Sequence, residues 1–565
     1  MEATSSAKPN KIGVERPAGS RVAHDAKSGA LITTRSAYLI ALGFVLFFGA
    51  LVRVGPLLMT SFPLNDGGMF MQAIIDLRHA NFRLPDTLQY NGLPIAYAYP
   101  PLGFYIAGLV AATTNASLFT VLRIIPALFS MLTLVAFMLL AHDFLRKRES
   151  VIIASLAFAL VPRSHNWEIM GGGLTRSIGF FFAILAIWQA HRLYTRHSRL
   201  SLALTSVFGA FACLSHLEMG MFVAFSAVLL FLVYGRNWTG LRDSIVVALS
   251  VLALTSPWWG TVIAHHGVEP FLNASRTGNH SPIAILVLLI DPNWGQEPFF
   301  PLFSALAFVG TFYALVQRRY FLPLWVAAGL LIDPRKFETE AMVPMSMLVA
   351  ICVIDLFIPM IRERVTTPSR VKLNHRVMAW VSPLVVGLLI MYGLISSFAT
   401  AAQGDVGLSS GERQAMEWVR VSTPPESRFI VISGDSWPLD RSGEWLPVLS
   451  NRVSASTVQG YEWLPDNAYV KQENAYHALQ ECTAMAASCV DVWGAKYHAS
   501  FNYVYIATRE ASNGGVYPRG ACCGGLAASF ASDPDYTLVF QNEGATIFER
   551  KSAALNDSDR RRTPL

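Results

Sequence analysis

Long apolar runs separated by short polar segments dominate the first four hundred residues of the chain. The hydrocarbon core of a bilayer requires about 20 apolar residues per spanning helix, so we expect these runs to be membrane-spanning helices. Eleven such segments precede residue 400, centred on 37–59, 120–142, 151–162, 176–194, 200–216, 218–235, 244–264, 299–317, 320–332, 341–361 and 376–398. The third and ninth are short for a span, so their ends are expected to face protein or water.

Two segments between residues 60 and 119 have a helical pattern without the length of a span. Apolar residues recur at helical spacing from Met69 to Leu77, with polar residues on the other faces. Pro100 and Pro101 suit the first turn of a second, apolar helix. We expect two helices, at 66–79 and 100–113, that lie on the outer membrane interface.

The pattern changes after residue 400, where helix-like and strand-like segments mix. The predicted elements are a helix at 412–421, strands at 428–433 and 503–506, and a hairpin formed by 536–541 and 545–549. The sequence therefore predicts a polytopic α-helical membrane protein with about 11 transmembrane helices. These helices occupy 37–399, a C-terminal extracytoplasmic mixed α/β domain occupies 400–550, and disordered tails occupy 1–36 and 551–565.

Composition and charge support a membrane protein and give its orientation. Hydrophobic residues make up 53% of the 565 residues and charged residues 15%, with a mean hydropathy of +0.40, too apolar for an ordinary soluble protein. The loops on the amino-terminal side hold 21 Lys and Arg, and the opposite loops hold seven. By the positive-inside rule, we expect an integral protein of the plasma (inner) membrane with a cytoplasmic N-terminus. No nucleic-acid partner is indicated, because the basic residues are scattered over six loops.

The six cysteines fit this topology. Cys213 and Cys352 lie inside predicted spans, where cysteine behaves as a small apolar residue. The other four fall in the C-terminal domain, where an oxidising compartment would let them pair. Four cysteines allow three connectivities, and the sequence does not choose among them.

Asp66 is the leading catalytic candidate. It follows the first span and precedes Gly67 and Gly68, which allow the backbone to approach a ligand closely. A carboxylate at this position can deprotonate or orient an incoming hydroxyl or amine. The alternative is that Asp66 caps the helix that follows, since Asp is a favoured N-cap residue.

The next outer loop, 162–176, is unusually polar for a segment between two apolar runs. Such residues are costly unless they face a water-filled cavity. Glu168 is the second acidic candidate, and Arg163 and Arg176 are candidates for substrate binding. The alternative for Glu168 is a local ion pair with one of these two arginines.

Histidine and carboxylate side chains recur at two other predicted outer turns. His216 and Glu218 could bind a sugar hydroxyl or a metal, or could simply cap the neighbouring helices. A second group could form a metal cluster, although no HExxH spacing is present. Its members are His265, His266, Glu269 and His280.

Arg335 and Lys336 lie on the predicted outer side, against the general charge bias. Arg binds phosphate through a planar fork and Lys adds a point charge, so the pair could hold the phosphate or pyrophosphate of a lipid carrier. Pairing with nearby acidic residues such as Asp333, Glu338 or Glu340 is an equally good explanation.

The order of these features resembles the GT-C glycosyltransferases, which include protein O-mannosyltransferases, the aminoarabinose-lipid A transferase and the catalytic subunit of oligosaccharyltransferase. The resemblance covers nearly the whole chain, from the acid after the first span, through Tyr99-Pro100-Pro101-Leu102, to the outer C-terminal domain. It implies that Asp66 is the catalytic base, Glu168 the second-loop acid and Arg335 the residue that meets the carrier phosphate. The WWDYG motif of oligosaccharyltransferases and the paired Asp-Glu of protein O-mannosyltransferases are absent, which argues against both of those activities.

The resemblance implies inverting transfer from a polyprenyl-phosphate-linked sugar to an extracytoplasmic glycan, lipid or protein acceptor at the lipid bilayer. Tyr99 and His216 complete the expected substrate-binding residues. The metal requirement is left open, with a divalent cation such as Mg²⁺ or Mn²⁺ as one option. Aromatic residues of the C-terminal domain could stack on a saccharide or belong to the core, namely Trp437, Trp445, Tyr461 and Trp463.

Two other classes of function remain open at this stage. Charged outer residues could line the path of a lipid or saccharide transporter or flippase of the cell envelope, although no paired halves are detected. A non-enzymatic envelope assembly factor is the third class.

Overall fold

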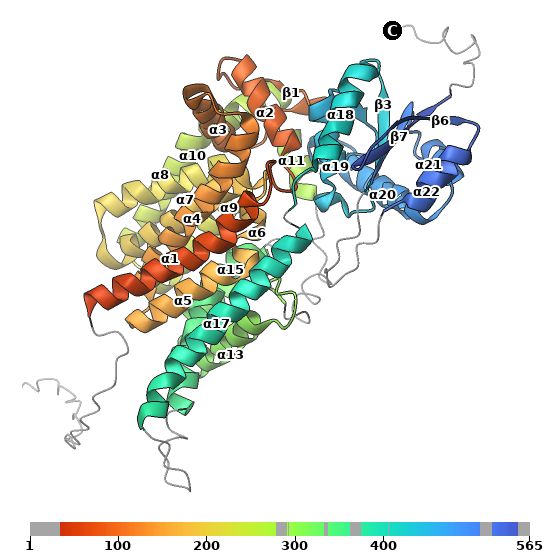
Figure 1. Cartoon of the computed structure of the whole chain (residues 1–565). Coiled ribbons are helices and arrows are strands. Elements are labelled where there is room, and N and C mark those ends of the chain that lie inside the picture. Colours follow the sequence, from red (N-terminus) through yellow and green to blue (C-terminus); the bar gives the residue numbers. More distant parts are fainter. Residues whose placement is uncertain are drawn as a thin grey trace, which may run out of the picture.

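The protein consists of a helical bundle joined to a smaller domain that contains a sheet (Figure 1). The computed structural model describes residues 34–277, 291, 293–332, 337–361, 375–404, 406–508 and 522–551. The bundle lies on one side and the C-terminal domain on the other, with the short helices α2 and α3 between them at one end of the bundle. The last bundle helix, α17 (His375–Gly404), leads directly into the C-terminal domain.

The bundle helices occupy all eleven segments predicted as spans. They are α1 (Arg35–Leu58), α4 (Leu118–Phe144), α5 (Arg148–Leu160), α7 (Gly173–Arg196), α8 (Arg199–Ser215), α9 (Leu217–Tyr234), α10 (Trp238–His266), α13 (Leu302–Val316), α14 (Phe321–Ile332), α15 (Phe337–Ala350, continued by a π-helical turn, Ile351–Phe357) and α17. Seven helices among the described residues are long and apolar enough to cross a membrane. The chain is thus an integral membrane protein, and eleven crossings remain a prediction.

Local sequence signals explain where several bundle helices begin. The side chains of Thr34, Ser117, Ser198 and Asn237 accept hydrogen bonds from backbone N–H groups in the first turns of α1, α4, α8 and α10, as expected for N-cap residues. Large apolar side chains such as Phe44, Leu249 and Trp380 are exposed on the bundle surface. These side chains suit a lipid-facing surface, because lipid tails are as apolar as they are.

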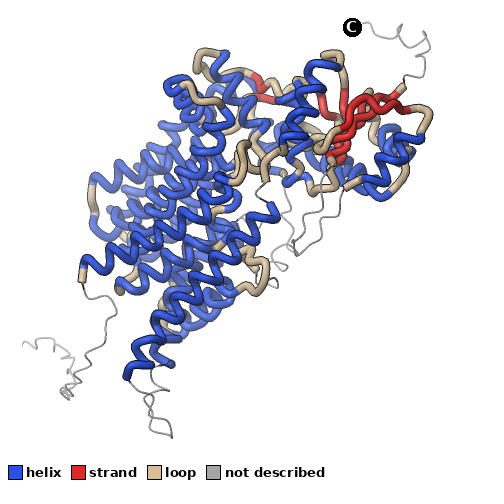
Figure 2. Tube along the Cα trace, in the orientation of Figure 1, coloured by secondary structure: helices blue, strands red, loops and turns tan. Residues whose placement is uncertain are grey.

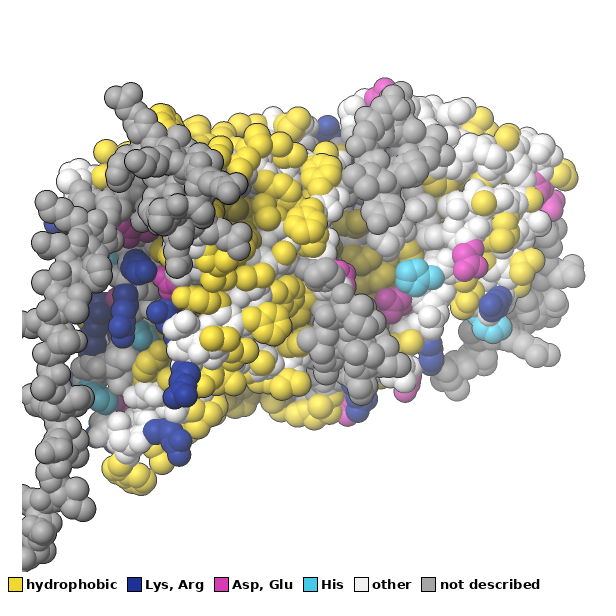
Figure 3. Space-filling view, turned by 90° about the horizontal axis from the view of Figure 1, so that it is seen from below, with side chains coloured by type: hydrophobic (Ala, Val, Ile, Leu, Met, Phe, Trp, Pro, Cys, Tyr) yellow, Lys and Arg dark blue, Asp and Glu magenta, His cyan; other side chains and the backbone are white. Residues whose placement is uncertain are grey.

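The surface of the bundle carries its charges at one end. In Figure 3 an apolar surface covers the middle of the bundle, and Lys and Arg side chains gather at the end remote from the C-terminal domain. Several of them pair with acids there, for example Lys147 and Arg319 with Asp355, and Arg192 with Asp143. This distribution agrees with the charge bias read from the sequence.

Short elements cover the opposite end of the bundle. Helices α2 (Gly68–His79) and α3 (Leu102–Thr114) occupy the two segments predicted as interfacial helices, and a small hairpin, β1 (Thr87–Leu88) with β2 (Ile95–Ala96), lies between them in sequence. The 3₁₀ turn η1 (Pro162–Ser164) and the helix α6 (Asn166–Ile169) form the loop before α7, and α11 (Glu269–Arg276) follows α10. Whether α2 and α3 lie on a membrane surface stays a prediction.

The C-terminal domain is built on a five-stranded mixed sheet, coloured red in Figure 2. The order is β4-β3-β5-β7-β6, with β3 (Arg428–Ile432) parallel to β4 (Val453–Ser454) and to β5 (Tyr503–Ala507). The strands β6 (Tyr536–Gln541) and β7 (Ala545–Arg550) form the predicted hairpin. The surrounding helices are α18 (Ser410–Ser422), α19 (Arg441–Ser450), α20 (Ala468–Gln480), α21 (Ser488–Lys496) and α22 (Gly524–Ser532), with 3₁₀ turns η3 (Trp437–Leu439), η4 (Tyr461–Trp463) and η5 (Glu481–Ala484).

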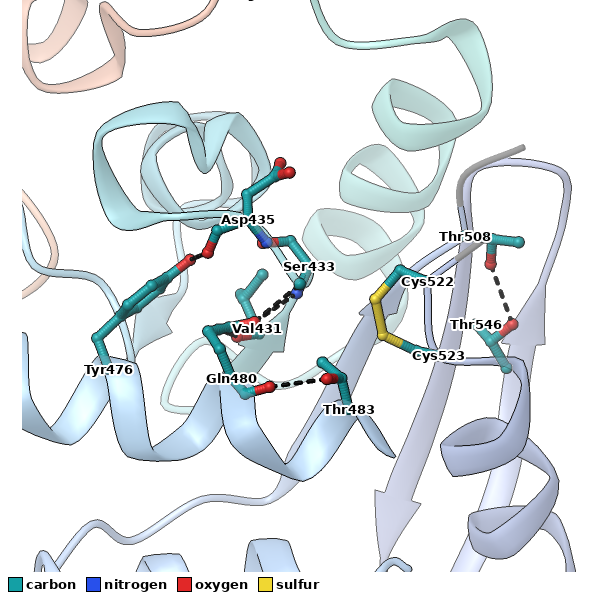
Figure 4. Close-up of a disulfide and its surroundings, with 11 residues drawn as sticks. Val431, Ser433, Asp435, Tyr476, Gln480, Thr483, Thr508, Cys522, Cys523 and Thr546 are labelled. Carbon is teal, nitrogen blue, oxygen red and sulfur yellow. Dashed lines mark hydrogen bonds between the residues drawn. A yellow bond between two sulfur atoms is a disulfide. The ribbon is translucent and has the colours of Figure 1, made fainter. Parts of the chain in front are cut away.

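Two disulfides lie in the C-terminal domain and settle the connectivity that the sequence left open. Cys482 pairs with Cys489, and Cys522 pairs with its neighbour Cys523. Figure 4 shows the second bond beside the ends of β5 and β7, where Thr508 and Thr546 meet. These cysteines pack against the face of the sheet that carries Ile430 and Ile432, whereas Trp445 packs against the opposite face, with Phe429 and Val431.

Candidate active site

Asp66 lies in the loop between α1 and α2, and two glycine segments let this loop pack closely against the start of α7. Gly67 has a backbone φ of 125°, a conformation that residues other than glycine rarely adopt. Gly172 lies against the Asp66 side chain so closely that an added Cβ would overlap the carboxylate. The glycine-rich segments on both sides therefore place Asp66 directly on the N-terminus of α7.

The Asp66 carboxylate has two partners at that helix terminus. Its Oδ1 accepts a hydrogen bond from the Gly172 N–H at 2.8 Å, and its Oδ2 lies 3.2 Å from Nη2 of Arg176. Both side chains are part-exposed, at 17% and 23%. Asp66 and Arg176, predicted from separate loops, therefore form one ion pair.

The alternative prediction that Asp66 caps α2 is wrong. Gly67 is the N-cap residue of α2, and Asp66 makes no capping hydrogen bond to it. The N–H groups of Gly67 and Met69, at the start of this helix, instead donate to Oε1 of Glu444 in α19, with N···O distances of 2.9 and 3.4 Å. The physical reason is that Asp66 turns toward α7, where a guanidinium and a backbone N–H are available.

Glu168, on α6, is buried beside this pair, with 2% of its surface exposed. Its Oε2 has no hydrogen-bond partner among the described residues. Burial raises the pKa of Glu168 to about 7, although the nearby Arg176 and Arg53 favour the charged form. The expected alternative of an ion pair with Arg163 or Arg176 is not found, because Arg176 pairs with Asp66 and Arg163 with Glu338.

Tyr99 and His216 approach the same place from two other elements. The Tyr99 hydroxyl lies 3.2 Å from Oγ1 of Thr175 in the first turn of α7, and the Tyr99 ring lies 6.1 Å from that of His216. His216 is at the turn between α8 and α9, with its Nδ1 3.7 Å from Oε2 of Glu218. The charges of Arg176, Glu218 and Asp66 all act on the Tyr99 phenol, whose pKa burial raises above its usual range. Tyr99, Thr175 and His216, from three separate predicted loops, therefore lie close together at the start of α7.

An aromatic cavity adjoins Tyr99 on the side of the C-terminal domain. Trp463 of η4 packs against Tyr99 with 5.7 Å between ring centroids and closes this cavity. The lining residues are Met69, Phe70, Ala73, Leu88, Ile95, Ala96, Tyr97, Tyr99, Phe104 and Trp463. Of the four aromatic residues considered for saccharide stacking, Trp463 lines this cavity and Trp445 is fully buried, and both belong to the same hydrophobic core.

The predicted phosphate clamp, Arg335 and Lys336, lies outside the described residues. The nearest described acid after it, Glu338 in the first turn of α15, forms an ion pair with Arg163 of η1. Arg163 also donates its N–H to the carbonyl of Gly295. Arg163 therefore has a structural partner and ties the Glu168 loop to the start of α15.

Glu444 is the site residue that the sequence analysis missed. It is 5% exposed, and its carboxylate lies where the Asp66 loop enters α2. Burial, then the Asp66 carboxylate, raises the pKa of Glu444 to about 8. No local motif marks this residue, because 377 positions separate it from Gly67.

The described carboxylates do not fit a metal site. No group of three or more His, Cys, Asp and Glu among them is arranged to hold an ion, and Asp66 is engaged by Arg176 and Gly172. His265 and His266 both contact Asp86 at the protein surface, and His280 of the predicted cluster falls in a part of the chain that is not described.

Known structures share this architecture, whereas sequence comparisons find no relative. No protein-family model matches the chain, and no curated protein matches its sequence. The archaeal oligosaccharyltransferase AglB from Archaeoglobus fulgidus, solved with an inhibitory peptide and a dolichol-phosphate, aligns with a TM-score of 0.53 and 15% identity over 83% of this chain and 69% of its own.

Two other solved structures align over almost the whole of this chain. ArnT from Cupriavidus metallidurans, bound to undecaprenyl phosphate, aligns with a TM-score of 0.51 and 13% identity, over 91% of this chain and 99% of its own. The arabinofuranosyltransferase AftD from Mycobacteria aligns with a TM-score of 0.51 and 14% identity, over 92% of this chain and 40% of its own. All three are GT-C glycosyltransferases. The chain therefore has the fold of the GT-C membrane glycosyltransferases.

Proposed function

We propose that the protein is a membrane glycosyltransferase that moves a hexosyl or pentosyl group from a polyprenyl-phosphate-linked donor to an extracytoplasmic acceptor, with inversion. The observation that carries this proposal is the position of Asp66, held against Arg176 and Gly172 where the bundle meets the C-terminal domain. A fold alone does not define a reaction, so the proposal rests on this site within the fold.

The proposed reaction is a displacement at the anomeric carbon of the donor sugar. The acceptor oxygen forms the new bond to this carbon, the bond from the carbon to the phosphate oxygen breaks, and the polyprenyl phosphate leaves with the bonding electrons. The Asp66 carboxylate takes the acceptor proton or orients the acceptor. Glu168 is the second acid of the site, and with a pKa near 7 it is able to exchange a proton at neutral pH.

The phosphate end of the donor needs cationic partners as negative charge develops on the leaving group. Arg335 and Lys336 are the proposed partners, with Arg163 and Arg176 as the next positions to test. Support comes from the neighbours: AglB was solved with a dolichol-phosphate and ArnT with undecaprenyl phosphate. The acceptor is proposed to enter beside Tyr99 and His216, whose rings lie 6.1 Å apart.

A transfer assay with the purified full chain in proteoliposomes tests the proposal. Undecaprenyl-phosphate-linked arabinose, mannose and glucose are each offered with glycan, lipid and peptide acceptors, and products are identified by mass spectrometry. We expect the wild-type chain to form one glycosylated product and Asp66→Asn to lose at least a hundredfold in rate, the usual loss for a catalytic base. The control is Asp76→Asn, because Asp76 accepts hydrogen bonds from Gln72 and Gln89 rather than from Gly172 or Arg176.

Two results would contradict the proposal. Full activity of Asp66→Asn would remove Asp66 from the chemistry. Movement of the intact lipid-linked sugar across the vesicle membrane, without any glycosylated product, would indicate a transporter instead.

A further inference from the structure

Glu444 caps α2 from another part of the chain. The first N–H groups of a helix have no partner within the helix and are usually capped by a side chain just before it. At α2 the preceding residue is Gly67, which has no side chain, and the Glu444 carboxyl oxygen Oε1 accepts from both Gly67 and Met69. The cap of the helix that follows Asp66 is thus supplied by the C-terminal domain.

The C-terminal domain also holds the residue before Asp66. The backbone carbonyl of Asn65 accepts a hydrogen bond of 2.8 Å from the Trp445 indole. The side-chain amide of Asn65 donates one of 2.9 Å to the Pro438 carbonyl. The backbone on both sides of Asp66 is therefore fixed by α19 and the turn before it, while the carboxylate of Asp66 itself binds α7.

Glu444 is in turn fixed by its own neighbours. Its Oε2 accepts from the Gln459 amide at 3.3 Å, and its backbone carbonyl accepts from the Tyr90 hydroxyl at 2.8 Å. Trp445 packs edge-on against Phe62, with 4.7 Å between ring centroids. The Glu444 carboxyl group is therefore a buried, oriented acceptor rather than a mobile surface group.

We propose that Glu444 is a positioning residue for Asp66, and that sugar transfer requires the C-terminal domain because this domain completes the loop that carries the base. The inference rests on the proposed function for the role of Asp66, but the contact itself does not. A positioning role requires an acceptor oxygen in the right place rather than a negative charge. The amide oxygen of an uncharged glutamine can accept the same two N–H hydrogen bonds, so it should be able to fill this role.

Four variants of the full chain, compared with wild type in lipid nanodiscs, test this role. Glu444→Ala removes both hydrogen bonds, and Glu444→Asp shortens the side chain by one methylene. Glu444→Gln keeps an oxygen for Gly67 and Met69 but replaces the acceptor that faces the Gln459 amide. The matched control is Asp491→Asn, because Asp491 lies in the same domain and its partners, Tyr536 and Arg550, belong to neither α19 nor α2. Amide hydrogen exchange at residues 64–71 and the kcat and KM for the lipid-linked sugar active in the transfer assay are measured for each.

We expect Glu444→Ala to raise exchange at Gly67 and Met69 by roughly five- to tenfold, the effect of a lost helix cap. We also expect its kcat to fall at least tenfold with an unchanged KM for the donor. Glu444→Asp should show the same pattern to a smaller degree, which keeps the test valid if the Ala variant does not fold. Glu444→Gln should retain at least half of both the protection and the kcat, and Asp491→Asn should match wild type at this loop.

Unchanged exchange at Gly67 and Met69 in both the Ala and Asp variants would overturn the contact and the proposal together. Raised exchange with unchanged kcat, in a protein that Asp66→Asn inactivates, would show that Glu444 only stabilises the fold. If Asp66→Asn is itself fully active, the proposed function of Asp66 fails and the positioning role fails with it, while the exchange data still decide whether Glu444 holds the loop.

Discussion

Asp66 and Glu168 are two carboxyl groups of one site with contrasting surroundings. Asp66 forms an ion pair and accepts a backbone hydrogen bond, whereas Glu168 is almost fully buried and one of its oxygens has no hydrogen-bond partner in the described structure. Carboxyl groups in such different environments commonly take different roles in catalysis. This contrast favours Asp66 as the group that deprotonates or orients the acceptor, and Glu168 as a group that exchanges a proton at neutral pH.

Gly172→Ala tests whether the close packing of Asp66 on α7 matters. The added methyl group would overlap the Asp66 carboxylate, so we expect it to displace Asp66 and lower the transfer rate at least tenfold. The matched control is Gly260→Ala in α10, where an added Cβ meets nothing within 4 Å. Transfer rates normalised to folded protein check the prediction, and equal rates for the two variants would contradict it.

Arg335→Ala tests the proposed contact with the carrier phosphate. Loss of a charge-assisted hydrogen bond costs roughly 1.5 to 3 kcal/mol, which is about ten- to a hundredfold in donor affinity or turnover. Arg335→Lys should recover only part of this loss, because the planar fork is absent. Binding of undecaprenyl phosphate and donor kinetics are measured, with Arg318→Ala as a control at the other end of the bundle. Reduced stability with intact donor kinetics would instead indicate a structural ion pair.

Local sequence identified most of the residues that the structure brings together, and its failures have a physical cause. Asp66, Tyr99 and Arg176 were found because polar groups between apolar spans are conspicuous. Their pairing was not predictable, because it depends on how separate loops pack. Glu444 was missed because a helix cap is normally sought within a few residues of the helix, and this cap comes from a distant part of the chain.

At the level of elements, the contact between α2 and α19 joins two helix N-termini through one side chain. Glu444 lies in the first turn of α19 and caps α2 at the same time. An acidic group at a helix N-terminus is favourable for both helices. Its protonation therefore bears on the stability of this contact.

The folded state is expected to lose stability as the pH rises, because burial and the Asp66 carboxylate disfavour the charged form of Glu444. Burial and the Asp66 carboxylate raise the pKa of Glu444 from the ordinary 4.5 to about 8, with Glu462 adding to the effect. Between these values the folded protein holds a proton that the unfolded chain releases, so the free energy of unfolding falls from about pH 4.5 to pH 8. Glu168 acts in the same direction up to about pH 7.

Thermal unfolding checks this dependence. We expect the Tm of the wild-type chain to decline between pH 5 and pH 8, and the decline to be shallower in Glu444→Gln, which cannot ionise. The same slope in both proteins would show that Glu444 does not titrate in this range.

In the C-terminal domain the sequence predicted α18 and four of the five strands, but not the helices α19, α20, α21 and α22 or the strand β4. The helix α18, the strands β3 and β5 and the β6–β7 hairpin lie within a residue or two of their predicted bounds. The two-residue strand β4 and its parallel pairing with β3 were missed, because so short a segment carries no alternating pattern. Parallel pairing depends on a crossover connection that local sequence does not specify.

At the level of the whole molecule, the charged end of the bundle and the C-terminal domain lie at opposite ends (Figure 3). By the positive-inside rule, we expect a reporter fused after residue 150 to be active only in the cytoplasm. A reporter fused after residue 410 should be active only outside. The reverse result would also place Asp66 on the cytoplasmic side and overturn the proposed site.

The segment that follows α17 has a consequence for how such proteins can be recombined. Its Val406 carbonyl accepts from the Asn65 N–H, and Gly407 pairs with Leu64 in an antiparallel bridge. A chimaera that exchanged the C-terminal domain for that of another protein with this fold would also replace this bridge, Trp445 and Glu444. If the proposed function is correct, we expect that exchanging the C-terminal domain alone will not transfer acceptor preference, and that the matching first loop must be exchanged with it.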